Sequence, residues 1–166
     1  MYRKILFLIL LIPILVSAQG VNKLVIEEKS GKTMIVGLCD RTVFADTNFS
    51  WWYEPEYKNY EVNTAELDSI KEKLTDVKIK IIFGTWCSDS RREVPRFLKI
   101  LDSLTFNPAD LEMICVDRNK KAEGTGVDKL EIKLVPTFII LRGDKEIGRI
   151  VEEPKAALEE DLNKIL

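Results

Sequence analysis

Histidine is absent from this chain of 166 residues. Ser-His catalysis, Cys-His catalysis and histidine-ligated metal sites are therefore excluded, because no other side chain ordinarily titrates near pH ~6.5. An excess of one charge is also lacking, since 25 Lys and Arg face 27 Asp and Glu, for a net charge of −2. Without a basic stripe, nucleic acid and anionic membrane surfaces are not expected as partners. The chemistry must come from cysteines, carboxylates, lysines or hydroxyls.

A hydrophobic run long enough to span a bilayer is lacking at the N-terminus. Two basic residues precede an apolar stretch over 5–16, which is interrupted by Pro13 and followed by the small-residue site Ser17-Ala18. A membrane span needs about 20 apolar residues, so the pattern predicts a signal peptide over residues 1–18, with an uncleaved anchor as the alternative. We expect an exported protein, periplasmic or extracellular, with no membrane attachment after cleavage.

Length and composition indicate one domain. The chain can bury one core but is short for two, and 46% hydrophobic with 31% charged residues is ordinary globular composition. Disorder is therefore not expected. We expect residues 19–166 to form a single domain, with an N-terminal elaboration over 19–62 and a core over 63–166.

Hydrophobic periodicity predicts alternating strands and helices. We expect buried strands over 79–83, 111–116 and 138–141, a hairpin partner over 146–151, and an N-terminal hairpin formed by 24–26 and 34–38. Helices are expected from the end of the first buried strand to Leu104, near 127–130, from Pro154 to the end, and over 63–74 with Asn63 and Glu66 as a capping pair. The aromatic segment 40–62 is expected to pack onto the domain, with a ligand surface as the alternative.

Cys87 lies directly after a predicted buried strand, at the first turn of a predicted helix. Unpaired backbone N–H groups and the helix dipole favour negative charge at such a position, so we expect a reactive thiol. Arg91 and Arg92 add to this effect, and Asp89 opposes it. Trp86 is expected to form an apolar wall. A buried structural cysteine at a strand end is the alternative.

These residues resemble thioredoxins and their exported relatives, whose motif is Trp-Cys-x-x-Cys at the end of a central strand. The matching features in this sequence are Trp86-Cys87 with Ser90 at the second cysteine position, Pro95 in the following helix, Asp117 to Asn119 after the middle strand, and Val135-Pro136-Thr137. The resemblance implies an α/β, thioredoxin-like three-layer sandwich, with a mixed central sheet flanked by helices, an N-terminal β-hairpin and an aromatic-rich elaboration. It also implies a cis Pro136 beside the cysteine and substrate binding by Trp86, Val135 and Pro136.

The sequence departs from the thioredoxin pattern at two positions. Ser90 cannot join a disulfide, and Ile81 stands where many thioredoxins carry a buried acidic residue. A dithiol cycle within the motif is therefore impossible, but a lone thiolate can still form a mixed disulfide that another thiol resolves. We expect Cys87 as the nucleophile, with Ser90 at most a hydrogen-bond donor to it. Cys115 is expected in the core, and for Cys39 three roles are open: resolving thiol, partner of Cys115, or unpaired thiol.

The resulting hypothesis is a thiol–disulfide exchange protein that works through one cysteine, acting on protein or peptide thiols and disulfides. The alternative is a non-catalytic, chaperone-like binding module of the same fold. A third possibility is a structural domain that binds through the aromatic segment 49–60. No cofactor and no metal are expected, and the sequence gives no indication of the oligomeric state.

Overall fold

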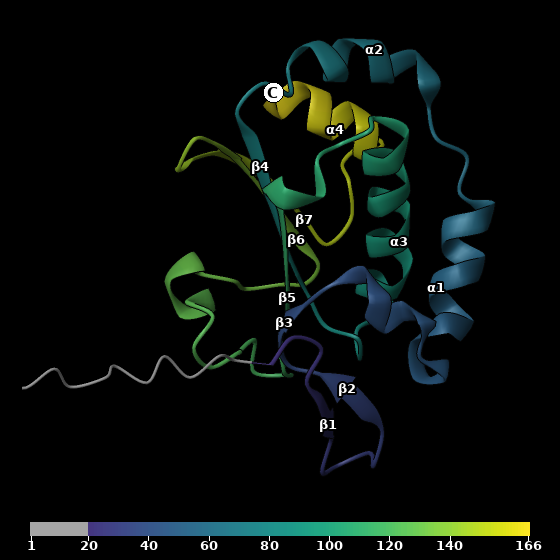
Figure 1. Ribbon diagram of the computed structural model, residues 1–166, viewed down its shortest axis with the longest axis vertical. Coiled ribbons are helices and arrows are strands. Elements are labelled where there is room, and N and C mark those ends of the chain that lie inside the picture. Colours follow the sequence, from purple (N-terminus) through teal and green to yellow (C-terminus); the bar gives the residue numbers. More distant parts are fainter. Residues whose placement is uncertain (1–19) are drawn as a thin grey trace, which may run out of the picture.

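A five-stranded mixed sheet organises the protein (Figure 1). The computed structural model describes residues 20–166, so the predicted signal peptide over 1–18 lies outside the described residues. In the order β3-β5-β4-β6-β7, the strands are β3 (Gly37–Cys39), β5 (Leu111–Cys115), β4 (Val77–Phe83), β6 (Thr137–Arg142) and β7 (Lys145–Val151). Strands β4 and β5 are parallel and the other pairs are antiparallel. The predicted β6–β7 hairpin is confirmed.

Helices cover one face of the sheet. Because successive strand residues point to opposite faces, Ile79 and Ile81 of β4 join one core cluster, and Ile82 joins the other. The first cluster contains buried side chains from four helices: α1 (Thr47–Asn59), α2 (Thr64–Glu72), α3 (Ser88–Ser103) and α4 (Leu158–Ile165). In Figure 1, α1 and α3 lie to the right of the sheet, and α2 and α4 lie at the top. The helix predicted after the first buried strand is α3, which continues through Pro95.

An irregular segment covers the second face near the carboxyl end of β4. Its side chains include Val127 from the short 3-10 helix η3 (Val127–Leu130), as predicted near that position. Left-handed backbone at Gly126 (φ 75°) and Glu131 (φ 53°) bounds η3 on both sides, so the helix ends after about one turn. Two further 3-10 helices are η1 (Arg41–Ala45) and η2 (Pro108–Asp110). The predicted α/β, thioredoxin-like fold with a mixed sheet flanked by helices is confirmed.

The N-terminal hairpin differs from the prediction in its second strand. Strand β1 (Leu24–Ile26) pairs with β2 (Thr33–Ile35) in a separate two-stranded sheet, so the predicted strand over 34–38 is wrong beyond Ile35. Gly37 has φ 112°, a conformation that residues with a Cβ rarely adopt. The chain turns there and continues as β3, which pairs with β5 in the main sheet. Cys39 is therefore part of a strand.

The aromatic segment forms a helix that the sequence did not predict. Asp46 caps α1 by accepting a hydrogen bond from the Asn48 amide, and Pro55 lies inside the helix. Phe49 and Trp52 are buried on the helix-covered side, whereas Trp51 is 62% exposed. Most of the aromatic side chains here thus belong to or pack against the core, and Trp51 is the most exposed of them.

Two helix starts also differ from the predictions. The last helix begins at Leu158 and not at Pro154, because Ala157 is extended and the Asp161 carboxylate accepts a hydrogen bond from the Lys155 amide. Helix α2 is capped by Asn63 as predicted, but Glu66 does not complete the pair. A carboxylate oxygen of Glu159 accepts the hydrogen bond of the Asn63 amide instead.

Candidate active site

Cys87 lies at the junction between β4 and α3. It is the N-cap residue of α3, with extended backbone (φ −88°, ψ 132°), and its amide donates a 2.9 Å hydrogen bond to the Gly84 carbonyl. The tight turn over 84–87 therefore places the side chain at the positive end of a 16-residue helix. Cys87 is half-buried, whereas the other two cysteines are buried.

Trp86 forms one wall of the site. Its indole Nε1 donates a 2.9 Å hydrogen bond to the Val116 carbonyl, and the Arg118 guanidinium lies 5.1 Å from the ring centroid. A Cβ at Gly84 would lie 2.6 Å from the indole, so only glycine lets the ring pack this closely against the turn. Trp86 is thus fixed from two sides.

An ion pair from the N-terminal hairpin supports this wall. Arg118 donates hydrogen bonds to both carboxylate oxygens of Glu27, which follows β1. These bonds, together with one from the Ser30 hydroxyl, lower the pKa of Glu27 to about 2. The same carboxylate raises the pKa of Arg118. The hairpin therefore reaches the site through two contacts, from Glu27 to Arg118 and from Arg118 to Trp86.

Ser90 is fully buried and turned toward the strand end. Its hydroxyl oxygen accepts a 3.2 Å hydrogen bond from the Gly84 amide. The sulfur of Cys87 instead lies 3.2 Å from the Val135 carbonyl, to which the thiol donates. Ser90 thus ties α3 to the end of β4, and the polar partner of the Cys87 thiol is backbone.

The loop before β6 forms the opposite wall. The Val135–Pro136 peptide bond is cis, and both residues are buried. Leu134 next to them is 44% exposed, and its carbonyl accepts a 2.7 Å hydrogen bond from the Thr137 hydroxyl. The structure therefore brings Trp86, Cys87, Val135 and Pro136 together at one end of the sheet.

Arg91 lies one turn into α3 and faces the same end of the molecule. Its Nε donates a 2.7 Å hydrogen bond to the Thr85 carbonyl, and its guanidinium lies 5.4 Å from the ring centroid of the exposed Trp51. Burial lowers the pKa of Arg91, and electrostatic attraction to Cys87 opposes that effect. Within residues 20–166 no carboxylate forms an ion pair with Arg91, whereas Arg92 pairs with Asp89. Of the two neighbouring arginines, Arg91 alone offers an unneutralised cation to the site.

The structure does not bring Cys39 to Cys87. Cys39 and Cys115 belong to the cluster on the helix-covered face, with their sulfurs 3.4 Å apart, while Cys87 packs against the cluster of the second face. Both thiols are free and buried. Of the three roles open for Cys39, the geometry is that of a partner for Cys115.

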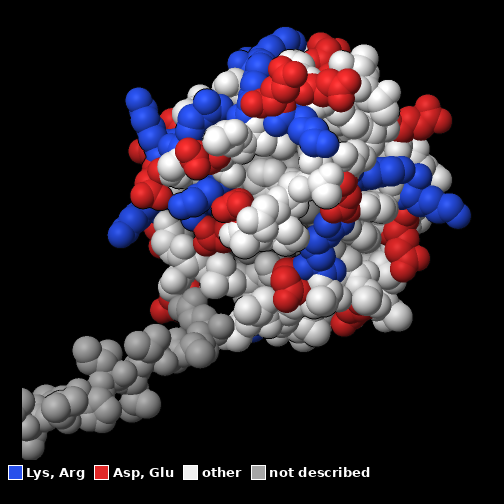
Figure 2. Space-filling view, turned by 45° about the horizontal axis from the view of Figure 1, so that its top comes forward, with Lys and Arg blue, Asp and Glu red and all other residues white. Residues whose placement is uncertain are grey.

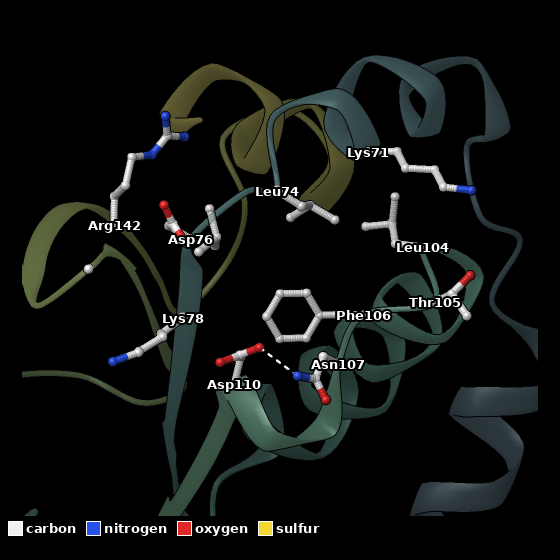
Figure 3. Close-up of a pocket in the computed structure, with 12 residues that line it drawn as sticks. Lys71, Leu74, Asp76, Lys78, Leu104, Thr105, Phe106, Asn107, Asp110 and Arg142 are labelled. Atoms are coloured by element: carbon white, nitrogen blue, oxygen red, sulfur yellow. Dashed lines mark hydrogen bonds between the residues drawn. The ribbon is translucent and has the colours of Figure 1, made fainter.

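A cavity of about 580 Å³ lies at the other end of β4 (Figure 3). Lys78 and Asp76 border it on one side and the residues after α3 on the other, with the Phe106 ring between them. Asn107 on its rim donates a 2.8 Å hydrogen bond to Asp110. The residues that line this cavity offer no thiol, so it is separate from the chemistry at Cys87.

Charges of both signs surround the remaining surface. On the face in Figure 2, Lys and Arg lie beside Asp and Glu over most of the area. Across residues 20–166, no three His, Cys, Asp or Glu side chains are positioned to hold a metal ion. In the same part of the chain, no helix is long and apolar enough to cross a membrane.

Three side chains of the site were missed by the sequence analysis. Glu27 and Trp51 precede the motif by many residues, and no local pattern connects them to it. Arg118 lies in the turn over 117–119, which is one of the features that match thioredoxins. This match placed Arg118 near the motif, although no role was predicted for its side chain. Only the tertiary fold reveals its contact with Trp86.

Part of this chain is similar to known thioredoxins. No protein-family model matches the chain. Over 100 residues it is 28% identical to thioredoxin H2-1 of Oryza sativa subsp. japonica, a match that covers 60% of this chain and 68% of that protein. Among solved structures, Fasciola hepatica thioredoxin is 20% identical, with a TM-score of 0.42 over 60% of this chain and 89% of its own. Plasmodium falciparum thioredoxin is 22% identical, with a TM-score of 0.41 over 61% and 92%.

Proposed function

We propose that this protein catalyses thiol–disulfide exchange on protein or peptide substrates through Cys87 alone. The proposal is supported chiefly by the position of Cys87, a half-buried residue at the start of α3 whose sulfur lies 3.2 Å from the Val135 carbonyl. The sequence similarity to a thioredoxin points to the same chemistry. Protein thiols and disulfides are the corresponding class of partner.

The proposed reaction has two balanced steps. The Cys87 thiolate attacks one sulfur of a substrate disulfide, the substrate S–S bond breaks, and the departing substrate thiolate takes up a proton. A thiolate from the substrate or from a small-thiol pool then attacks the mixed disulfide and releases Cys87. When a substrate thiol resolves it, the substrate disulfide is rearranged. When a small thiol resolves it, a second small thiol attacks the small-thiol mixed disulfide in a further step, so the substrate is reduced and the small thiols leave as their disulfide.

The loop at Val135 is the proposed docking edge for the substrate chain. Backbone hydrogen bonds to an extended segment tolerate many sequences, which suits an exchange protein with several substrates. Trp86 and the exposed Leu134 would flank such a segment with apolar surface. Arg91 would hold the developing thiolate by its positive charge.

The decisive experiment compares two positions of a thiol on the same helix. The probe is 4,4′-dithiodipyridine, which releases a coloured thiopyridone when a thiolate attacks it. Wild type is compared with Cys87→Ser and with the double variant Cys87→Ser/Ser103→Cys, whose thiol occupies the exposed last position of α3. Since the helix dipole and Arg91 act only at Cys87, we expect wild type to react at least about tenfold faster than the double variant.

Loss of the fast phase in Cys87→Ser supports the proposal. Equal rates for wild type and the double variant would show an ordinary surface thiol and would overturn it. A catalytic test follows on a protein with scrambled disulfides: recovery of its activity should require Cys87 and should not change in Ser103→Ala.

A non-catalytic, chaperone-like binding module is the second candidate. It is favoured by the exposed apolar side chains Trp51 and Leu134, which border the same end of the molecule. This role would persist in Cys87→Ser, measured as suppressed aggregation of an unfolded client, and would decrease in Leu134→Ser.

Export to an oxidising compartment is proposed from the sequence over residues 1–18. The first residue of the mature protein, determined by N-terminal sequencing of protein made in a secreting host, tests it. We expect cleavage after Ala18. Retention of the full N-terminus in the membrane fraction would favour the uncleaved anchor.

A further inference from the structure

Cys39 and Cys115 lie diagonally across two paired strands. In the antiparallel register of β3 and β5, Cys39 is opposite Met113, and Cys115 is opposite Gly37. Met113 and Cys115 share one face of β5 because side chains alternate along a strand. The two cysteines therefore point to the same side of the sheet, which is the face that the helices cover.

The two sulfurs are in direct contact. They lie 3.4 Å apart, with Cys39 7% exposed and Cys115 fully buried. A disulfide has an S–S length of about 2.05 Å, so bond formation requires the sulfurs to approach by only about 1.4 Å. Both cysteines belong to the same cluster of buried apolar side chains as Phe83 and Met113, and within residues 20–166 neither sulfur has another hydrogen-bond partner.

Burial makes the folded pair slow to react. Burial, followed by the hydrogen bond with Cys39, raises the pKa of Cys115 well above its ordinary value. A thiol that stays protonated is a poor nucleophile. Strand β3 is short and lies at the edge of the sheet, where it pairs only with β5, so Cys39 becomes accessible whenever this strand is undocked during folding.

We propose that Cys39 and Cys115 form a structural disulfide that joins β3 to β5, which is independent of any role of Cys87. The oxidant is the disulfide of a small thiol or of an oxidising protein. The Cys39 thiolate attacks it and releases one thiol, and Cys115 then displaces the second thiol from Cys39. Two electrons and two protons thus pass from the cysteines to the oxidant.

The proposal accounts for the odd number of cysteines. With Cys39 and Cys115 joined, Cys87 is the one thiol left free among the three. The crosslink would also fix the strand to which the N-terminal hairpin is attached, and with it the Glu27–Arg118 contact behind Trp86. A reduced pair would leave β3 held only by its backbone hydrogen bonds and packing.

The test is a thiol count on the full chain. Protein refolded with reduced and oxidised glutathione is freed of small thiols, denatured and titrated with Ellman's reagent. We expect at most one thiol in wild type, since oxidised glutathione also reacts with Cys87, none in Cys87→Ser, and three in wild type after prior reduction. Peptide mapping should recover Cys39 linked to Cys115. Three thiols in refolded wild type, or a crosslink that includes Cys87, would overturn the proposal.

A stability measurement provides a second, independent result. Dithiothreitol should lower the Tm of Cys87→Ser by several degrees and leave that of Cys39→Ala/Cys115→Ala unchanged, because only the former keeps the crosslink. An equal response of both variants would contradict the proposal. The wild-type thiol count requires no variant, so it decides the question even where the double variant fails to fold.

Discussion

Cys87 and the pair Cys39–Cys115 lie against the same sheet but in opposite surroundings. Cys87 is half-exposed at a helix start, beside the cation of Arg91 and a backbone carbonyl. Cys39 and Cys115 are packed among apolar side chains under the helices, with only each other as polar partners. One sheet thus offers a site suited to transient sulfur bonds and a site suited to a permanent one.

This difference shows that solvent access and neighbouring charges determine the reactivity of each cysteine. Cys87 is partly open to other molecules, whereas burial raises the pKa of the Cys115 thiol and encloses it. The contrast between the two sites has four measurable consequences, which differ in size.

The largest expected effect is a difference in labelling rate between the two sites. In fully reduced native protein, iodoacetamide should modify Cys87 at least about 100-fold faster than Cys39 or Cys115, because the buried thiols react only after opening of the fold. Mass spectrometry of peptides from timed samples measures all three rates. In denaturant the three rates should converge. If Cys39 were labelled as fast as Cys87 in the native protein, the two sites would not differ in access.

The next effect concerns the missing partner in the motif. Ser90→Cys places a second thiol within the first turn of α3, where it attacks a mixed disulfide on Cys87 intramolecularly. The covalent intermediate trapped from wild type should therefore become at least about tenfold less abundant on a non-reducing gel. The control is Ser90→Ala, which offers no thiol and should leave the intermediate abundant. An undiminished intermediate in Ser90→Cys would show that position 90 cannot reach Cys87.

A smaller effect is expected from the unneutralised cation. Arg91→Met removes the charge but keeps the stem over Trp51, so the reaction of Cys87 with 4,4′-dithiodipyridine should slow by about two- to fivefold. Arg92→Met is the matched control on the same turn, since Arg92 is paired with carboxylates. Similar slowing in both variants would assign the effect to the helix and not to Arg91.

The smallest expected effect is a pH dependence at the hairpin. The Arg118 contact lowers the pKa of Glu27 from 4.5 to about 2, so this contact stabilises the folded state fully above about pH 4.5 and loses its contribution as the pH falls toward 2. The Tm difference between wild type and Glu27→Gln should therefore shrink from pH 6 to pH 2. Glu28→Gln, at the exposed neighbouring residue, serves as the control. A Tm difference that stays constant from pH 6 to pH 2 would show that the Glu27–Arg118 ion pair does not stabilise the fold.

Much of the fold follows from local sequence signals. The isoleucine-rich β4 and the periodic apolar residues of α3 each encode their own element, and the turn at Gly143 explains the hairpin of β6 and β7. Helix α1 could not be predicted in this way, because buried Phe49 and Trp52 alternate with the exposed Trp51 and the helix interior contains Pro55. The change of sheet at Gly37 depends on a backbone angle that the sequence permits without requiring.

In the candidate site too, residues that are neighbours in the sequence could be predicted, and contacts between distant residues could not. The residues of the Trp86–Ser90 motif are contiguous, so the predicted strand–helix junction together with the resemblance to thioredoxins identified them. The approach of Val135 to Cys87, and of Cys39 to Cys115, depends on which strands pair, which one sequence does not specify. The resemblance to thioredoxins supplied the first approach, and nothing in the sequence chose among the roles open for Cys39.

The Glu27–Arg118 contact also sets an order of assembly. The two residues are 91 positions apart, so during synthesis the hairpin leaves the ribosome long before its partner exists. The N-terminal hairpin is therefore synthesised well before it can form this contact. The Glu27–Arg118 pair behind Trp86 forms only after β4 and β5 have been translated. Nascent chains would thus carry the Cys87 thiol before the surroundings that select its partners are in place.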